Sequence, residues 1–391
     1  MKVLMVSTSY PLHKGSVSGI FVKRLKTALD ERCEVDVVSP DDRNSRESEP
    51  GVFRSNYAPK KWQILAHEPG GIPVQIKKNY SSVFLVPSLL LSFFCSVFKR
   101  ANSYDVIHAN WAVSGAISAP ACRLFRKVLI TTLRGEDVKK RLGITGRFFL
   151  RSALKYSHAI VVVSESMLDL LEVEYPEYKH KYRVINNGVD FINMDKPPAV
   201  DKNVFDGRCF EIVSVGSLIP RKNVEYSLRE LALVKKSGLK FRYRIIGGGV
   251  CKPLLEGLSK DLGIDHCVEF VGPVTPNEVA EVLSNSTFLI SSSLHEGRPN
   301  VVMEAMAAGC CVLLSDIDGH RELIQKSKCG KLFNCERDGG LANTLLDVAQ
   351  KTESVVNMGH SGRRYIESKQ LTWDKSASEY MSCYAELLSS E

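Results

Sequence analysis

The chain has 391 residues, of which 44% are hydrophobic and 25% charged, and it carries a formal net charge of +8. This composition is typical of a soluble globular protein and excludes general disorder, while the length exceeds one ordinary core and predicts two domains. The eleven cysteines are scattered and include no Cys-x-x-Cys pair. They predict reduced core thiols in a cytoplasmic protein, Cys95, Cys310 and Cys311 among them, and disfavour a zinc site.

The positive charge is concentrated in the first half of the chain. Residues 1–197 hold 29 Lys and Arg against 19 Asp and Glu, whereas residues 198–391 hold 23 against 25. A basic half favours an anionic partner such as a membrane surface, a phospholipid-linked acceptor or an acidic glycan, although solubility alone explains the charge equally well.

Two apolar stretches bear on targeting. The first residues enter a short apolar run at once, which predicts a strand and no secretion signal. The longest apolar stretch, residues 82–98, contains Pro87 and several serines and is short for a bilayer span, so we expect no membrane-spanning helix.

Short β-branched runs alternate with helical patterns in both halves, which predicts two parallel sheets covered by helices, that is, two Rossmann-like domains. A polar, proline-broken linker is expected at residues 195–201, and a last helix with Trp373, Tyr380 and Tyr384 closes the chain. The predicted domains are residues 1–197 and 198–370, followed by the segment 371–391. Strands are expected at 3–6, 35–38, 106–108, 128–132, 160–163 and 182–185, and then at 211–215, 243–246, 268–271, 288–291 and 312–314.

Three features of the first half are candidates for ligand contact. A flexible loop after the first strand ends at Gly19, where a backbone can approach a ligand closely. His108 and Trp111 lie at a strand end, although His108 is equally well explained as a buried, satisfied histidine. Basic residues between 139 and 151 surround Phe148 and Phe149, which suits either an anionic membrane surface or a solvated helix face.

In the second half, the loop of residues 216–223 places Arg221 and Lys222 after a strand and before a helix, where two cations can neutralise a diphosphate. Neither the loop at Gly19 nor the run that includes Gly248 completes a Gly-x-Gly-x-x-Gly fingerprint, which disfavours a nicotinamide enzyme.

The stretch from His295 to Gly309 is the most specific signal in the chain. Pro299 suits the first position of a helix and Gly309 the residue just past its end, so the helix begins between Glu296 and Glu304. The backbone N–H groups at its start and the helix dipole favour a phosphate, and the two carboxylates can accept hydrogen bonds from sugar hydroxyls. The amides concerned are those of Gly297, Arg298, Asn300 and Val301.

The spacing of these two glutamates, with Glu-Ala-Met-Ala-Ala-Gly closing the motif, resembles the paired-glutamate motif of retaining glycosyltransferases, in particular glycosyltransferase family 4. The resemblance implies the α/β GT-B architecture, in which two Rossmann-like domains face an interdomain cleft and the last helix crosses back onto the first domain. Sequence alone also allows a surface helix on the second domain.

The resemblance also implies roles for particular residues. Glu304 would hold the ribose, Glu296 the transferred sugar, and Lys222 with Arg221 the diphosphate. Ser217 stands where the family has an Arg, so either that contact is missing or Arg221 or Arg298 supplies it from another angle. Further donor contacts are expected from Ser217, Gly19, Glu322 and Gly248, and a catalytic contact from His108.

On the acceptor side, the resemblance implies contacts from Trp111 and from Arg134, which replaces a family histidine beside the transferred sugar. The expected reaction is retaining transfer from a nucleoside diphosphate sugar, with UDP favoured and GDP next, to a glycan or lipid-linked acceptor in bacterial surface polysaccharide synthesis. We expect no metal, no other cofactor and no nucleic-acid partner, in a cytoplasmic protein that is peripheral to the membrane.

Rival functions are a sugar-nucleotide epimerase of the same architecture and a non-catalytic nucleotide-sugar or membrane-binding relative. A glycoside hydrolase is disfavoured because its two carboxylates must lie about 5–9.5 Å apart across one bond. A helix rises about 12 Å over eight residues.

Overall fold

The computed structural model describes residues 1–13, 16, 18–45, 49–67, 71–138, 143–190, 198–202 and 209–390. The chain forms two compact units. Unit 1 comprises Met1–Gly188 and Trp373–Glu391, and unit 2 comprises Val189–Thr372. The divisions therefore fall after residues 188 and 372, whereas the expected boundaries are residues 197 and 370.

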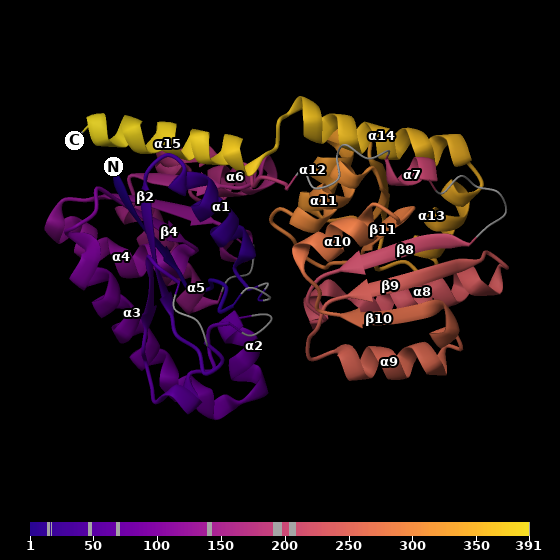
Figure 1. Ribbon diagram of the computed structural model, residues 1–391, viewed down its shortest axis with the longest axis horizontal. Coiled ribbons are helices and arrows are strands. Elements are labelled where there is room, and N and C mark those ends of the chain that lie inside the picture. Colours follow the sequence, from indigo (N-terminus) through magenta and orange to yellow (C-terminus); the bar gives the residue numbers. More distant parts are fainter. Residues whose placement is uncertain are drawn as a thin grey trace. The chain divides into compact units, whose positions relative to one another are not determined.

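Unit 1 is built on a seven-stranded parallel sheet of order β3-β2-β1-β4-β5-β6-β7 (Figure 1). The order reverses between β1 and β4, which is the switch point where ligands of open α/β sheets bind. The strands are β1 Lys2–Ser7, β2 Glu34–Pro40, β3 Val52–Ser55, β4 Val106–Asn110, β5 Val128–Leu133, β6 Ala159–Val162 and β7 Tyr182–Val184.

Helices cover both faces of this sheet because successive apolar side chains of each strand point to opposite faces. The side chains on each face belong to a separate apolar cluster. One cluster joins β1 and β2 to α1 and α15, and the other joins the same strands to α3 and α4. The helices are α1 Ile20–Asp30, α2 Gly71–Lys78, α3 Val86–Ala101, α4 Ala112–Phe125, α5 Ile144–Tyr156, α6 Glu165–Glu174 and α15 Trp373–Ser389, with 3-10 turns η1 Lys60–Trp62, η2 Tyr80–Leu85, η3 Glu136–Val138 and η4 Pro176–Lys181.

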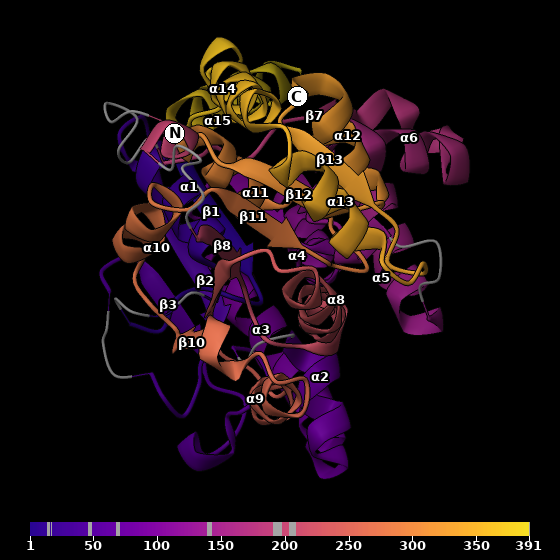
Figure 2. The same cartoon turned by 90° about the vertical axis from the view of Figure 1, so that its right-hand side faces the viewer.

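Unit 2 has a six-stranded parallel sheet of order β10-β9-β8-β11-β12-β13, with its own switch point between β8 and β11. Helices α8 and α10 pack on opposite sides of it (Figure 2). The strands are β8 Phe210–Val215, β9 Phe241–Ile246, β10 Val268–Gly272, β11 Phe288–Ser291, β12 Cys311–Ser315 and β13 Gly330–Phe333. The helices are α7 Ala199–Lys202, α8 Val224–Lys236, α9 Lys252–Asp261, α10 Pro276–Leu283, α11 Asn300–Ala308, α12 Asp318–Ser327, α13 Gly340–Ala349 and α14 Thr352–Ser368, with η5 Pro220–Lys222 and η6 Asp265–Cys267.

The last helix, α15, packs on unit 1, as the GT-B expectation requires (Figure 1). Its buried side chains recur at helical spacing, from Trp373 through Ala377 and Tyr380 to Tyr384. They join the core that α1 makes with the sheet. The alternative of a surface helix on the second domain is therefore wrong.

Two local predictions need correction. The expected linker at residues 195–201 lies partly outside the described residues, and its end belongs to α7, where Ala199 and Val200 are buried in the core of unit 2. Strands β3 and β13 are absent from the prediction because each is a four-residue strand at the edge of its sheet, too short for a clear alternating pattern.

The apolar stretch of the first half is longer than expected. Within the described part of the chain, one helical run, Tyr80–Ala101, is long and apolar enough to cross a membrane, with 22 residues and a mean hydropathy of 2.0. Pro87 does not interrupt this run, because it lies in the first turn of α3, where its missing N–H costs no helical hydrogen bond. Length and composition are weak evidence, since core helices of soluble proteins meet the same criteria.

The cysteines are free thiols throughout the described residues. Cys310 and Cys311 are completely buried, as expected. Cys95 is exposed, contrary to its expected place in the core, because it lies on the outward face of α3.

Candidate active site

The candidate site of unit 2 lies at the carboxyl ends of β8 and β11, on the two sides of the switch point. The first loop leads from β8 into η5 and α8, and the second leads from β11 to α11. Helix α11 begins at Asn300, one residue after the predicted start, because the carbonyl of Pro299 accepts the first helical hydrogen bonds. Gly309 ends the helix in a left-handed conformation, as predicted.

The centre of this site is an ion cluster made by Glu296, Lys222 and Arg221. The Lys222 ammonium lies 2.5 Å from Oε1 of Glu296, and Nη1 of Arg221 lies 3.5 Å from Oε2. Arg221 also donates to the carbonyl of His295 at 3.0 Å. The structure therefore brings together three of the four side chains predicted to be catalytic.

Glu296 is ionised in this environment. Its side chain is only 10% exposed, and burial alone would raise the pKa of its carboxyl. Lys222, Arg221 and a hydrogen bond from Ser293 outweigh burial and lower the pKa to about 2. At neutral pH Glu296 can accept hydrogen bonds from hydroxyl groups but cannot donate one.

Hydrogen bonds to backbone carbonyls join the two loops. The Ser292 hydroxyl donates to the carbonyls of Lys222 and Asn223, at 3.1 and 2.8 Å, and the N–H of Leu294 donates to the carbonyl of Arg221 at 2.9 Å. Asn223 takes a left-handed backbone conformation, with φ 50°, at the entry to α8. The positions of both cations are consequently fixed by the second loop as well as by their own.

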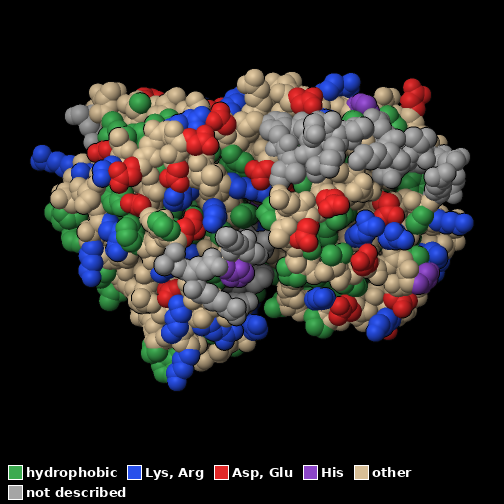
Figure 3. Space-filling model, in the orientation of Figure 1, with side chains coloured by type: hydrophobic (Ala, Val, Ile, Leu, Met, Phe, Trp, Pro, Cys, Tyr) green, Lys and Arg blue, Asp and Glu red, His purple; other side chains and the backbone are tan. Residues whose placement is uncertain are grey.

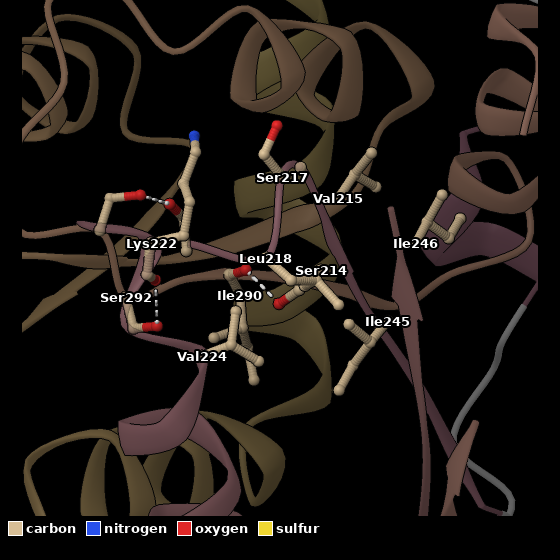
Figure 4. Close-up of a pocket in the computed structure, with 13 residues that line it drawn as sticks. Ser214, Val215, Ser217, Leu218, Lys222, Val224, Ile245, Ile246, Ile290 and Ser292 are labelled. Carbon is tan, nitrogen blue, oxygen red and sulfur yellow. Dashed lines mark hydrogen bonds between the residues drawn. The ribbon is translucent and has the colours of Figure 1, made fainter. Parts of the chain in front are cut away.

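A small polar pocket lies beside Lys222 (Figure 4). Ser217 and Lys222 extend toward the same side of it in this view, and Gly216 lies against the Lys222 stem. Its cavity volume is ≈ 20 Å³, room for about one water molecule and too little for a nucleotide. It is lined mainly by serine, glycine and aliphatic residues of β8, β9 and β11.

The glycine run after β9 is explained by packing between loops. A Cβ at Gly247 would lie 2.0 Å from the carbonyl oxygen of Gly216, and one at Gly249 would lie 2.3 Å from that of Leu218. The carbonyl of Gly248 accepts a hydrogen bond from the N–H of Leu218 at 2.9 Å. These contacts shape the loop of residues 216–223, and a direct contact of Gly248 with a donor remains a prediction.

Arg298 of the second loop lies close to Glu322 of α12. Arg298 is buried, with Nη1 3.9 Å from Oε1 of Glu322, and its Nε donates to the sulfur of Met303 at 3.1 Å. Lys326 donates to the same carboxylate at 3.1 Å. Glu322 and Met303 hold the Arg298 side chain inside the unit, and its replacement of the missing family arginine remains a prediction. Glu322 supports the loop through Arg298.

His320 and Ser293 belong to the site but have no counterpart in the prediction. His320 is completely buried on α12, its Nδ1 lies 3.0 Å from the carbonyl of Ser315, and burial lowers its pKa to about 4 although Glu296 acts to raise it. Ser293 hydrogen-bonds Glu296. Neither residue has an unusual spacing in the sequence; the serine run at the end of β11 is the signal that could have drawn attention to Ser293.

The remaining donor-side predictions concern Glu304, Val301 and Gly19. Glu304 lies half-buried in the middle of α11, and Val301 lies in its first turn. In unit 1, Gly19 has φ 70°, and a Cβ there would lie 2.3 Å from the carbonyl oxygen of Ser9. Chain packing therefore accounts for that glycine, and its contact with a donor remains a prediction.

His108 is a structural residue in this fold, which corrects its predicted catalytic role. It is completely buried, with Nε2 2.8 Å from the Thr132 hydroxyl and Nδ1 2.7 Å from the Tyr384 hydroxyl. Burial is the main cause that lowers its pKa to about 3, and Arg134 adds to the effect. A neutral imidazole with both nitrogens engaged cannot exchange protons with a substrate.

Arg134 and Trp111 come together at the carboxyl ends of β4 and β5. The Arg134 guanidinium donates to Oδ1 of Asn187 at 2.7 Å and to Oδ1 of Asn110 at 2.6 Å, and it lies 4.6 Å from the centroid of the Phe21 ring. The Phe21 ring also packs edge to face against the Trp111 ring, with the two ring centroids 5.7 Å apart. Trp111 also has a positive φ of 69°, a conformation that is costly for an aromatic residue. These contacts fit an acceptor-side contact but do not test it.

The basic segment expected at the membrane is only partly described. Lys139, Lys140 and Arg141 lie outside the described residues. Arg147, Phe148 and Arg151 are exposed on α5, whereas Leu150 is buried in the core.

Comparison with solved structures identifies the fold. Sucrose-phosphate synthase from Thermosynechococcus elongatus superposes with a TM-score of 0.80 at 18% identity, covering 100% of both chains. HepE from Anabaena in complex with UDP-glucose superposes with a TM-score of 0.74 at 17% identity, also over 100% of both chains. The protein has the GT-B fold of glycosyltransferases.

Sequence comparison identifies the family. Residues 18–191 match the family model described as Glycosyltransferase Family 4, and residues 195–365 match that of Glycosyl transferases group 1. The amylovoran biosynthesis glycosyltransferase AmsK of Erwinia amylovora is 25% identical over 297 residues, which is 72% of this chain and 70% of the relative. The chain belongs to the family 4 glycosyltransferases and is a transferase enzyme.

Proposed function

We propose that this glycosyltransferase moves a sugar from a nucleoside diphosphate sugar, with UDP as the favoured nucleotide and GDP next, to a glycan or lipid-linked acceptor. The transfer retains the configuration at the anomeric carbon and serves bacterial cell-surface polysaccharide synthesis. The enzyme works in the cytoplasm, on the inner face of the membrane. The similarity to HepE, which was solved with UDP-glucose, supports the donor, and the similarity to AmsK supports the pathway.

The observation that carries this proposal is the ion cluster at the switch point of unit 2. Two cations over one carboxylate leave a net charge of +1, since Arg221 and Lys222 outnumber Glu296. The side chains of Arg221 and Lys222 are 32% and 21% exposed, so an incoming anion can reach them. The start of α11 follows Glu296 by four residues and adds the positive end of a helix dipole. The diphosphate of the donor suits this environment.

Catalysis then rests on charge stabilisation and positioning. Lys222 and Arg221 stabilise the negative charge that develops on the leaving diphosphate. Glu296 accepts hydrogen bonds from hydroxyls of the transferred sugar and also holds both cations in place. Glu304 accepts hydrogen bonds from the ribose. The leaving phosphate takes the proton of the acceptor, which is consistent with the structural role of His108.

The test is thermal unfolding of the purified protein with UDP, GDP, ADP and CMP in turn. A ligand present at 100 times its dissociation constant stabilises the folded state by about 2.7 kcal/mol. We expect a selective rise of the melting temperature with UDP that is absent in Glu304→Ala and present in the control Glu256→Ala, on α9.

Three results would count against the proposal. Absence of any nucleotide response would favour a non-catalytic relative. A response retained in Glu304→Ala would contradict the ribose contact. Turnover of a sugar nucleotide without an acceptor would favour an epimerase.

A further inference from the structure

A cluster of large apolar side chains is exposed at one end of unit 1, on η1, η2 and the first turns of α3. The exposed fractions are 54% for Trp62, 77% for Tyr80, 83% for Phe84 and 63% for Leu91. We call this region, residues 60–62 and 77–91, the tip surface. Single exposed apolar residues need no explanation, but several large ones gathered on one surface indicate a binding partner.

The apolar character of α3 extends around the helix. Leu89, Phe93 and Val97 are buried against unit 1, as expected for a covering helix. On the opposite face of α3 Leu91 and Cys95 are exposed, four residues apart, and Phe84 is exposed in the preceding 3-10 turn η2. A helix that covers a sheet in water normally presents mainly polar residues on its outer face, whereas α3 exposes Leu91 and Cys95 there together with Ser88 and Lys99.

The tip surface itself contains only basic charged residues, since residues 60–62 and 77–91 include four lysines and no Asp or Glu. Residues 51–104 contain seven Lys and Arg but a single acid, Glu68, which lies outside the described residues. Lys77 and Lys78 are exposed at the end of α2, next to Tyr80 in the chain, and the Lys61 ammonium lies 5.4 Å from the centroid of the Trp62 ring. Lys60 contributes less, because it pairs with Asp41 at 2.8 Å. Hydrophobic and basic side chains gather over the lower end of this unit, where α2 and α3 lie (Figure 3).

The same segment is anchored in unit 1 and cannot leave it to span a bilayer. Phe93 and Val97 belong to the core that includes Leu4 and Ile107 of the sheet. Leu89 forms a second small core with Tyr57 and Leu65. Insertion of α3 across a membrane would expose both cores, so the helix can offer only its outer face.

We propose that the tip surface docks the protein on an anionic lipid bilayer. Trp62, Tyr80, Phe84 and Leu91 enter the boundary between headgroups and acyl chains, which aromatic side chains favour. Lys61, Lys77 and Lys78 lie at the level of the anionic headgroups, each adding to the affinity. This surface is separate from the basic segment at residues 139–151, and the docking goes beyond sugar transfer because it requires no nucleotide.

The experiment is co-sedimentation of the full chain with vesicles, without nucleotide. We expect binding to vesicles that contain phosphatidylglycerol, weaker binding to pure phosphatidylcholine, and weakening by salt on the anionic vesicles. Lys77→Glu with Lys78→Glu should weaken binding to the anionic vesicles about tenfold or more and remove most of the salt dependence. Phe84→Ser with Leu91→Ser should weaken binding to both kinds of vesicle.

Matched controls separate the tip surface from charge and apolarity in general. Lys236→Glu with Lys240→Glu makes the same charge change on exposed positions of unit 2, and Val173→Ser with Leu254→Ser removes two exposed apolar side chains elsewhere. Both controls should bind like the wild type. Glu304→Ala should also bind like the wild type, so a failure of the proposed transfer reaction does not affect this test. Thermal unfolding of each variant verifies that the fold is retained.

Two results would overturn the proposal. One is equal binding by the wild type and both tip variants, including no binding by any of them. The other is a wild-type dimer in sedimentation velocity that becomes a monomer in Phe84→Ser with Leu91→Ser, since the tip surface would then bind a second copy of the chain.

Discussion

Glu296 shows how far the chemistry of a single residue depends on its neighbours. Its spacing from Glu304 and the cations of the other loop were visible in the sequence, and they predicted a polar ligand site. The direct pairing of Glu296 with Lys222 could not be predicted, because 74 residues separate them and only the sheet order brings them together. The same holds for His320, whose buried position follows from the packing of α12 and not from a local pattern.

The low pKa of Glu296 predicts an acid-sensitive contribution to stability. Its carboxyl has a pKa of about 2 in the folded protein against 4.5 for an unperturbed glutamate. A lowered pKa in the folded state stabilises the protein above pH 4.5, and this stabilisation is lost as the pH falls from 4.5 toward 2. Glu296→Gln cannot titrate, so the difference in free energy of unfolding between wild type and variant should shrink over this window.

Denaturant unfolding of both proteins at a series of pH values measures that difference. Glu281→Gln, at an exposed position of α10, provides the comparison for a carboxyl without cation partners. A wild-type advantage over Glu296→Gln that stays constant through the window would show that the ion cluster does not form in solution.

At the scale of elements, the helices with clear end signals were predictable. Helix α11 was placed within one residue because Pro299 and Gly309 mark its ends, and α15 was recognised from its regular apolar positions. Helix α7 was missed because the prolines before it are typical of a linker. Cys95 of α3 was wrongly placed in the core because hydropathy along the chain does not tell which face of a helix is covered.

Helix α15 is fastened to the sheet through buried hydroxyl groups. The Tyr384 hydroxyl hydrogen-bonds Nδ1 of His108 on β4. The Tyr380 hydroxyl hydrogen-bonds the Thr132 hydroxyl on β5 at 2.9 Å. Tyr384→Phe leaves Nδ1 of His108 without this partner in an apolar core. We expect the free energy of unfolding to fall by about 1–3 kcal/mol, the cost of a buried polar atom without a hydrogen bond.

The same variant tests the structural role of His108. Because no proton transfer is assigned to His108, kcat and its pH profile should match the wild type while stability falls. Tyr156→Phe, at an exposed tyrosine of α5, should change neither quantity. A shifted pH profile of kcat in Tyr384→Phe would indicate that His108 takes part in the reaction.

At the scale of the whole molecule, two parallel sheets each carry polar residues at the carboxyl ends of the strands beside a switch point. This arrangement was predictable because alternating strands and helices define the class of fold, and the chain order of motifs places them after strands. The substrates were not predictable to the same depth. Base and acceptor are selected by loop shape and backbone contacts, which the spacing of residues does not encode.

The arrangement of charge in unit 2 leads to a prediction about metals. Lys222, Arg221 and the start of α11 together supply the positive charge that a leaving diphosphate requires, so transfer should need no divalent cation. Initial rates measured with EDTA should equal those with Mg²⁺. Lys222→Ala should lower kcat by about 100-fold, in line with the loss of one group that stabilises developing negative charge. Added Mg²⁺ should not restore the rate, because Lys222→Ala introduces no oxygen ligand that could hold the ion. Lys236→Ala, an exposed lysine of the same unit, is the control and should keep full activity. A rate that falls with EDTA and returns with Mg²⁺ in the wild type would mean that a cation shares the diphosphate with Lys222, and the charge balance of the site would then have to include it.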